Sequence, residues 1–207
     1  MNPIRRPFRY RYDNLALYLI GLNLLIFMAQ RFLPQVNILF ILNPLSVASG
    51  WIWQPLTYMF VHGGASHLIF NMLALFIFGS QVERRMGSKE FLLYYLFTGV
   101  FAGLFSFGVY WITRSYRVFL LGASGAVFAV ELAYAALFPS SVIYVWGIFP
   151  LRAPVMVLGF TALELCFSII GYQSGVAHLT HLAGFAFGWL YFLIRFGVNP
   201  WRAFRNG

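Results

Sequence analysis

A serine and a histidine lie in two short polar segments of an otherwise apolar chain. The serine is Ser124, within Gly122-Ala-Ser124-Gly125. The histidine is His181, which closes the run His178-Leu-Thr-His181. A serine hydroxyl becomes a good nucleophile only when a base removes its proton, and histidine is the usual base. The pattern therefore predicts Ser124 as a nucleophile and His181 as its base. Gly122 and Gly125 would shape a tight turn that leaves backbone N–H groups open to an oxyanion.

A third polar segment begins at His62 and continues to His67 and Asn71. His67 and Asn71 are four residues apart, so they share one face of a helix. Their side chains could donate hydrogen bonds in an oxyanion hole whose other donor is the backbone amide of Ser124. We interpret His62, which precedes the expected helix, as a residue that hydrogen-bonds loop backbone.

The sequence offers few partners for these histidines. Its five carboxylates are Asp13, Glu83, Glu90, Glu131 and Glu164. None is obviously placed to orient His181, so a Ser–His dyad is favoured over a triad. We expect no metal at the i, i+3 pair His178 and His181, because thiol or carboxylate partners are missing and no His-Glu-x-x-His motif occurs. The predicted chemistry needs no cofactor.

The amino-acid composition indicates whether these residues lie in water or in a membrane. The chain has 207 residues, of which 61% are hydrophobic and 9% are charged, and its mean hydropathy is +0.77. A soluble domain carries about 25% charged and about 45–50% apolar residues, so disorder and an ordinary soluble enzyme are excluded. The single cysteine excludes an internal disulfide. The expected fold is all-α, a polytopic membrane protein with about five to seven spans in one domain.

Apolar runs between polar breaks predict six spans. Their ranges are 14–30, 66–82, 90–110, 124–138, 151–170 and 176–196. Prolines and a glycine interrupt the apolar segment 32–62, which also carries Trp51 and Trp53. We expect this segment to be a long loop lying partly in the membrane interface, where aromatic side chains are favoured.

Lysine and arginine are divided unequally between the two sides of this six-span arrangement. Eleven lie on the side that holds both termini, including the basic ends 1–13 and 197–207, and three lie on the other side. The positive-inside rule then predicts that both termini are cytoplasmic. The same bias explains the net charge of +9 without a nucleic-acid partner, and it suits contact with anionic membrane lipids.

The three polar segments fall at one depth in this topology. The spans 66–82, 124–138 and 176–196 all begin on the outer side of the membrane. The span 124–138 has fifteen residues. At about 1.5 Å per residue it is about 22 Å long, against a hydrocarbon core of about 30 Å, so Ser124 should sit below the outer surface. The pair Gly184-x-x-x-Gly188 allows two helix backbones to approach closely.

In these segments the sequence resembles the rhomboid family of intramembrane serine proteases. The matching patterns are His62-x4-His67-x3-Asn71, Gly122-Ala-Ser124-Gly125, His181-x2-Gly184-x3-Gly188 and the 82–87 turn Val-Glu-Arg-Arg-Met-Gly. The resemblance extends over about residues 53–195 and implies the minimal six-helix bacterial fold. Two positions depart from the family pattern: Gln54 follows Trp53 in place of arginine, and Thr180 precedes His181 in place of alanine.

The resemblance implies roles for the residues of these motifs. Ser124 would be the nucleophile and His181 the base, and His67, Asn71 and the Ser124 amide would form the oxyanion hole. The substrates implied are single-pass membrane proteins, cleaved near the outer end of their transmembrane segment. No metal or cofactor is implied.

The resemblance also places a substrate gate between the second and fifth spans, at Phe160 and Phe167. The short chain without extra domains favours a bacterial inner membrane. Two alternatives remain open: a catalytically inactive relative that binds membrane clients, and a small transporter that uses Glu131, Glu164 and the histidines.

Overall fold

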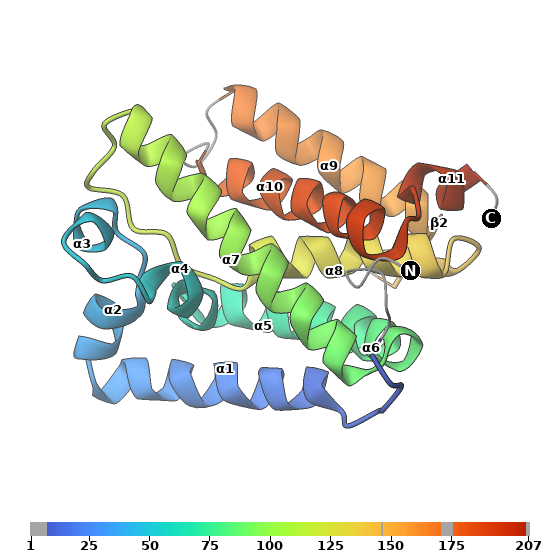
Figure 1. Cartoon of the computed structure of the whole chain (residues 1–207), viewed down its shortest axis with the longest axis horizontal. Coiled ribbons are helices and arrows are strands. Elements are labelled where there is room, and N and C mark those ends of the chain that lie inside the picture. Colours follow the sequence, from blue (N-terminus) through green and yellow to red (C-terminus); the bar gives the residue numbers. More distant parts are fainter. Residues whose placement is uncertain (1–7, 146, 171–175, 206–207) are drawn as a thin grey trace.

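The chain folds as a bundle of apolar helices (Figure 1), and the computed structural model describes residues 8–145, 147–170 and 176–205. Within that part of the chain, five helices are long and apolar enough to cross a membrane: Leu15–Phe32, Ala65–Met86, Ser88–Ile112, Ala153–Ile170 and His178–Phe196. A shorter apolar helix is Ser124–Leu137. The prediction of an all-α, multi-pass membrane protein is confirmed. Arg5 and Arg6 of the basic end 1–13 lie outside the described residues.

Each predicted span corresponds to one of these apolar segments. The helices are α1 (Leu15–Phe32), α5 (Ala65–Ala74), α6 (Ser80–Met86), α7 (Ser88–Ile112), α8 (Ser124–Leu137), α9 (Ala153–Ile170) and α10 (Val176–Tyr191). The second predicted span, 66–82, is divided between two of them, α5 and α6. A π-helical turn, η3 (Leu75–Gly79), joins α5 to α6, and a second, η4 (Phe192–Phe196), extends α10. Since α8 has only 14 residues, the count of six membrane-crossing helices stays a prediction.

The segment predicted as a long loop is ordered by short helices. They are α2 (Gln35–Phe40), α3 (Pro44–Ala48), α4 (Gln54–Thr57) and the 3-10 turn η2 (Tyr58–Phe60). The indole of Trp53 donates to the Leu39 carbonyl at 2.9 Å, and the buried Gln54 side chain accepts from the Asn43 amide at 3.1 Å. Gln54, one of the departures from the family pattern, therefore ties two parts of this segment together.

A short β-hairpin connects α8 to α9. It pairs β1 (Val142–Val145) with β2 (Phe149–Arg152) in antiparallel register, with Val142 opposite Arg152. The predicted fifth span, from about residue 151, agrees within two residues with α9, which begins at Ala153, whereas the hairpin before it was not predicted. An apolar run alone does not distinguish a strand from the first turn of a helix. The basic end 197–207 contains a further helix, α11 (Pro200–Arg205).

Helix α8 lies at the centre of the bundle, in contact with α5, α7, α9 and α10 (Figure 1). Small residues let its neighbours approach. A Cβ added at Gly184 of α10 would lie 2.0 Å from the Gly125 carbonyl oxygen of α8, and one added at Gly188 would lie 3.2 Å from the Ala129 Cβ. Only glycine fits at such separations, so α8 and α10 touch backbone to backbone beside the residues of interest.

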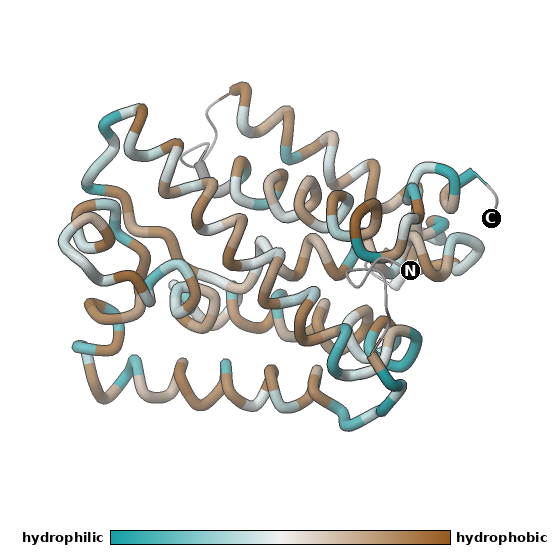
Figure 2. The backbone as a smooth tube through the Cα atoms, viewed as in Figure 1, coloured by the Kyte–Doolittle hydropathy of each residue, from teal (hydrophilic) through white to brown (hydrophobic). Residues whose placement is uncertain are grey.

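Hydrophobic and hydrophilic residues occupy different parts of the bundle. Figure 2 shows hydrophobic residues along the helices, whereas hydrophilic residues gather at helix ends and connections. Large apolar side chains are also exposed on the outside, for example Leu25 of α1 and Ile169 of α9. A helix that is apolar on its outer face is suited to contact with lipid.

Two buried glutamates fasten helices to one another. The Glu83 carboxylate of α6 accepts hydrogen bonds from the backbone amides of Leu15 and Ala16, at 2.7 and 2.9 Å. These amides belong to the first turn of α1, which has no intrahelical partners for them. The Arg195 guanidinium of η4 donates two hydrogen bonds to the Glu90 carboxylate of α7, at 2.7 and 2.8 Å.

Candidate active site

Ser124 is the first residue of α8, directly after a tight turn. Gly122 has a φ of +116°, a conformation that favours glycine. Its amide donates to the Tyr58 carbonyl at 2.9 Å, which fixes the turn against η2. A Cβ at Gly122 would lie 2.6 Å from Cε1 of His67, so the turn has room for glycine alone. The amides that follow the turn belong to the first turn of α8 and lack intrahelical acceptors.

His181 lies on α10 and faces the serine of α8. Its Nε2 is 2.7 Å from Ser124 Oγ. The imidazole is stacked on the ring of Phe128, with centroids 4.4 Å apart and planes inclined by 10°. The predicted nucleophile and base, 57 positions apart in sequence, are thus within hydrogen-bond distance. Sequence analysis missed Phe128, although it lies one helical turn after Ser124 and so shares its face.

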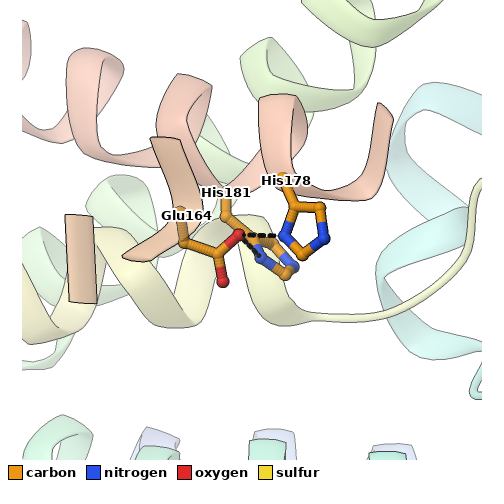
Figure 3. A group of neighbouring side chains, drawn as sticks. All are labelled: Glu164, His178 and His181. Carbon is orange, nitrogen blue, oxygen red and sulfur yellow. Dashed lines mark hydrogen bonds and ion pairs between the residues drawn. The ribbon is translucent and has the colours of Figure 1, made fainter. Parts of the chain in front are cut away.

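Glu164 of α9 contradicts the expectation that no acid is placed to orient His181. Its Oε2 lies 3.1 Å from His181 Nδ1 and 2.5 Å from His178 Nδ1, as Figure 3 shows. The argument that these histidines lack a carboxylate partner is therefore wrong. The ligand atoms of the three side chains lie within 4.8 Å of one another, a spacing that could hold a metal ion. Sequence position along α9 did not reveal which of its faces meets α10.

The residues predicted for the oxyanion hole lie on α5. The ring of His67 packs against the Gly122 turn, next to Ser124. The Asn71 side-chain amide donates to the His67 carbonyl at 2.8 Å, within its own helix. The structure therefore brings His67 to the serine turn, while one donor of Asn71 is already engaged with the backbone.

His62 is buried beside His67, and their ring centroids are 5.2 Å apart. Its backbone N–H and carbonyl both bond to the Gln30 side chain, at 3.1 Å each. Within the described residues its ring nitrogens make no hydrogen bond of normal geometry, although the backbone of Phe60 lies close enough to the ring to favour its protonated form. Burial, followed by repulsion from His67, lowers the pKa of His62 to about 4. Its ring is neutral at pH 7.

The remaining residues singled out in the sequence are spread over α8, α9 and α10. Phe160 packs against the buried core, and the Phe167 ring centroid lies 5.5 Å from that of His178. Their role as a gate stays a prediction. Glu131 is buried in α8, and its Oε2 has no hydrogen-bond partner in the part of the chain that the structure covers. Thr180, the second departure from the family pattern, hydrogen-bonds Ser106 of α7 at 2.6 Å between the two hydroxyl oxygens.

The chain is similar in sequence to members of one protein family. The Rhomboid domain family matches residues 49–198. YdcA of Bacillus subtilis is 30% identical over 146 residues, which cover 70% of this chain and 68% of the relative. The rhomboid protease AarA of Providencia stuartii is 31% identical over 159 residues, covering 70% of this chain and 56% of AarA. The rhomboid protease GluP of Bacillus subtilis is 42% identical over 93 residues, covering 44% of this chain and 17% of GluP. The family match spans well over half of the sequence and includes all three polar segments, so the chain belongs to the rhomboid family.

Proposed function

We propose that this rhomboid protein is an intramembrane serine endopeptidase that cleaves transmembrane segments of single-pass membrane proteins. The single observation that carries the proposal is the 2.7 Å contact between Ser124 Oγ and His181 Nε2 across α8 and α10. A hydroxyl and an imidazole held together in this way form a nucleophile with its base. The protease names of the relatives AarA and GluP support the same activity.

The reaction follows from the atoms that face each other. His181 Nε2 takes the proton of Ser124 Oγ as the oxygen attacks the scissile carbonyl carbon. The tetrahedral oxyanion is stabilised by the amides at the start of α8 and by the His67 side chain, which lies against the turn, with Asn71 as a further donor. His181 then gives its proton to the leaving amine. Water attacks the acyl-enzyme, again with His181 as base, and the serine is regenerated.

Substrate entry is proposed from the membrane. A transmembrane substrate would pass between α5 and α9, with Phe160 and Phe167 of α9 at the opening. It must unwind locally, because the carbonyls of a helix are already hydrogen-bonded and shielded. We place both termini in the cytoplasm and the protein in a bacterial inner membrane, with lipid around a single domain whose core spans about residues 53–195.

The test is covalent labelling and cleavage by purified protein in detergent. A fluorophosphonate should label the parent, and a labelled transmembrane substrate should be cut. Ser124→Ala should lose both, and His181→Ala should lower turnover by at least about 10²-fold. Ser80→Ala is a matched control, because Ser80 lies in α6 and its buried hydroxyl has no hydrogen-bond partner among the described residues.

Labelling that survives Ser124→Ala would contradict the assignment of the nucleophile. A folded parent that captures single-pass membrane proteins but neither reacts with the probe nor cleaves any substrate would instead be the inactive, client-binding relative. The Ser80→Ala variant should behave as the parent in each assay.

A further inference from the structure

A carboxylate touches the base on the side away from the serine. Glu164 Oε2 lies 3.1 Å from His181 Nδ1, while His181 Nε2 lies 2.7 Å from Ser124 Oγ (Figure 3). We propose that Glu164 is a positioning residue that completes a Ser124–His181–Glu164 triad, by holding the imidazole in its reactive tautomer and by stabilising its charged form. This inference rests on the proposed protease function.

The tautomer follows from the two neighbours of the His181 ring. An ionised carboxylate can only accept hydrogen bonds, so the ring nitrogen that faces Glu164 carries the proton. That nitrogen is Nδ1, which leaves the lone pair on Nε2 directed at the Ser124 hydroxyl. A base needs this tautomer, because a protonated Nε2 could not accept the serine proton.

No other group in the described part of the chain takes this role. His181 Nδ1 is shielded from solvent, and no aligned hydrogen bond is made to it within the described residues, so the carboxylate is its nearest polar neighbour. The contact has the length of an ion pair but not yet the alignment of a hydrogen bond. Catalytic hydrogen bonds are often poorly aligned without substrate and tighten in the complex.

His178 holds the carboxylate in place. Its Nδ1 lies 2.5 Å from the same Oε2, and it precedes His181 by one turn of α10. The side chains of Glu164 and His178 are only 14% and 12% exposed. Two imidazoles from α10 therefore fix a carboxylate from α9, and the packing of these helices sets the position of the base.

The charge of Glu164 matters most during the reaction. When Ser124 attacks, its proton moves to Nε2 and His181 becomes an imidazolium between an oxyanion and a carboxylate. Glu164 attracts this cation more strongly than the neutral ring, so the gain appears in the transition state and not in substrate binding. The carboxylate itself takes no proton, and the proton on Nε2 goes on to the leaving amine.

A metal ion is the competing occupant of the same three side chains. Zinc binds imidazole nitrogens at about 2.0–2.1 Å, which holds tetrahedral ligand atoms about 3.3 Å apart. The contact between Glu164 and His178 is clearly shorter, at 2.5 Å, and matches a proton shared between the two groups, while the 3.1 Å contact with His181 has the length of an ion pair. The spacing favours direct contact over a bridging ion.

The test compares Glu164→Gln, Glu164→Asp and the matched control Glu131→Gln in detergent. Glu131 is a buried carboxylate of α8 that interacts electrostatically with Glu164 but makes no contact with His181 among the interactions described, so its replacement controls for the loss of a neighbouring acid. Glu164→Gln should lower kcat by a factor of about 10 to 10⁴ with KM within about threefold, and should slow fluorophosphonate labelling in parallel. Glu164→Asp should have a higher kcat than Glu164→Gln, and Glu131→Gln should keep the kcat of the parent.

A folded Glu164→Gln variant with the parent's kcat, or with a raised KM alone, would overturn the proposal. If this variant does not fold, Glu164→Asp decides, because its carboxylate is shorter by one methylene: a lowered kcat at the parent's KM supports the proposal, and the parent's kcat overturns it. Activity of the parent that is lost with EDTA and restored by Zn²⁺ would assign the three side chains to a metal and also overturn it. Failure of the parent protein to react with the probe or to cleave a substrate would refute the protease function itself. The outcomes above concern only the role of Glu164 and leave the protease function intact.

Discussion

The backbone contact between α8 and α10 makes a sharp prediction for Gly184→Ala. The added Cβ would lie 2.0 Å from the Gly125 carbonyl oxygen and 2.8 Å from its carbonyl carbon, where ordinary contact begins at 3.4 Å. Both obstacles are backbone atoms that cannot rotate away, so α10 must retreat from α8 by about 1.4 Å. His181 lies one turn earlier on the same face of α10. A shift of that size would stretch its 2.7 Å contact with Ser124 to about 4 Å, beyond hydrogen-bond range.

The expected result is a loss of about 10²-fold or more in kcat/KM, since a misplacement of about 1 Å in a catalytic pair has this effect. Overpacking should also lower the free energy of unfolding by about 1–3 kcal/mol. Cleavage of a labelled transmembrane substrate measures the first effect, and thermal unfolding in detergent measures the second. Gly108→Ala is the matched control, because a Cβ at that position of α7 meets nothing within 4 Å. Activity of Gly184→Ala within twofold of the parent would refute the reasoning.

Three further predictions concern stability and are measured by thermal unfolding in detergent. Glu83→Ala removes the acceptor for two amides of α1 and should lower the free energy of unfolding by about 1–3 kcal/mol; an unchanged Tm would contradict this role. Glu90→Gln leaves the Arg195 guanidinium without its carboxylate and should lower the free energy of unfolding by about 1–3 kcal/mol, whereas an unchanged Tm would show that this ion pair is dispensable. The folded-state pKa of His62, about 4, lies below its unfolded value of 6.5, so the unfolded chain binds the proton first and stability is lost as the pH falls from 6.5 to 4. His62→Gln should flatten the dependence of Tm on pH in this window, and an equally steep dependence would count against the assignment.

Much of the fold could be predicted because the membrane constrains a sequence strongly. Backbone polar groups in lipid must be paired internally, so long apolar runs have to be helices. The ranges 14–30 and 90–110 therefore correspond to α1 and α7 within a few residues. The hairpin of β1 and β2 escaped prediction, because the segment between the fourth and fifth spans was read as a loop and strands this short give little periodic signal. The short helices within residues 35–60 were not predicted either, because local hydrogen bonds stabilise them and the hydropathy pattern does not reveal such bonds.

The sequence alone selected Ser124 and His181, because polar residues with reactive side chains are expensive in a membrane and are seldom placed there without a purpose. It also determined that small residues must lie near them, through Gly184 and its neighbours. Only the tertiary structure decided that Glu164 meets the base and that Phe128 stacks on it. Those contacts depend on the rotation of each helix about its own axis, which is set by packing against the other helices. Hydropathy cannot supply that angle when a helix is apolar on every side.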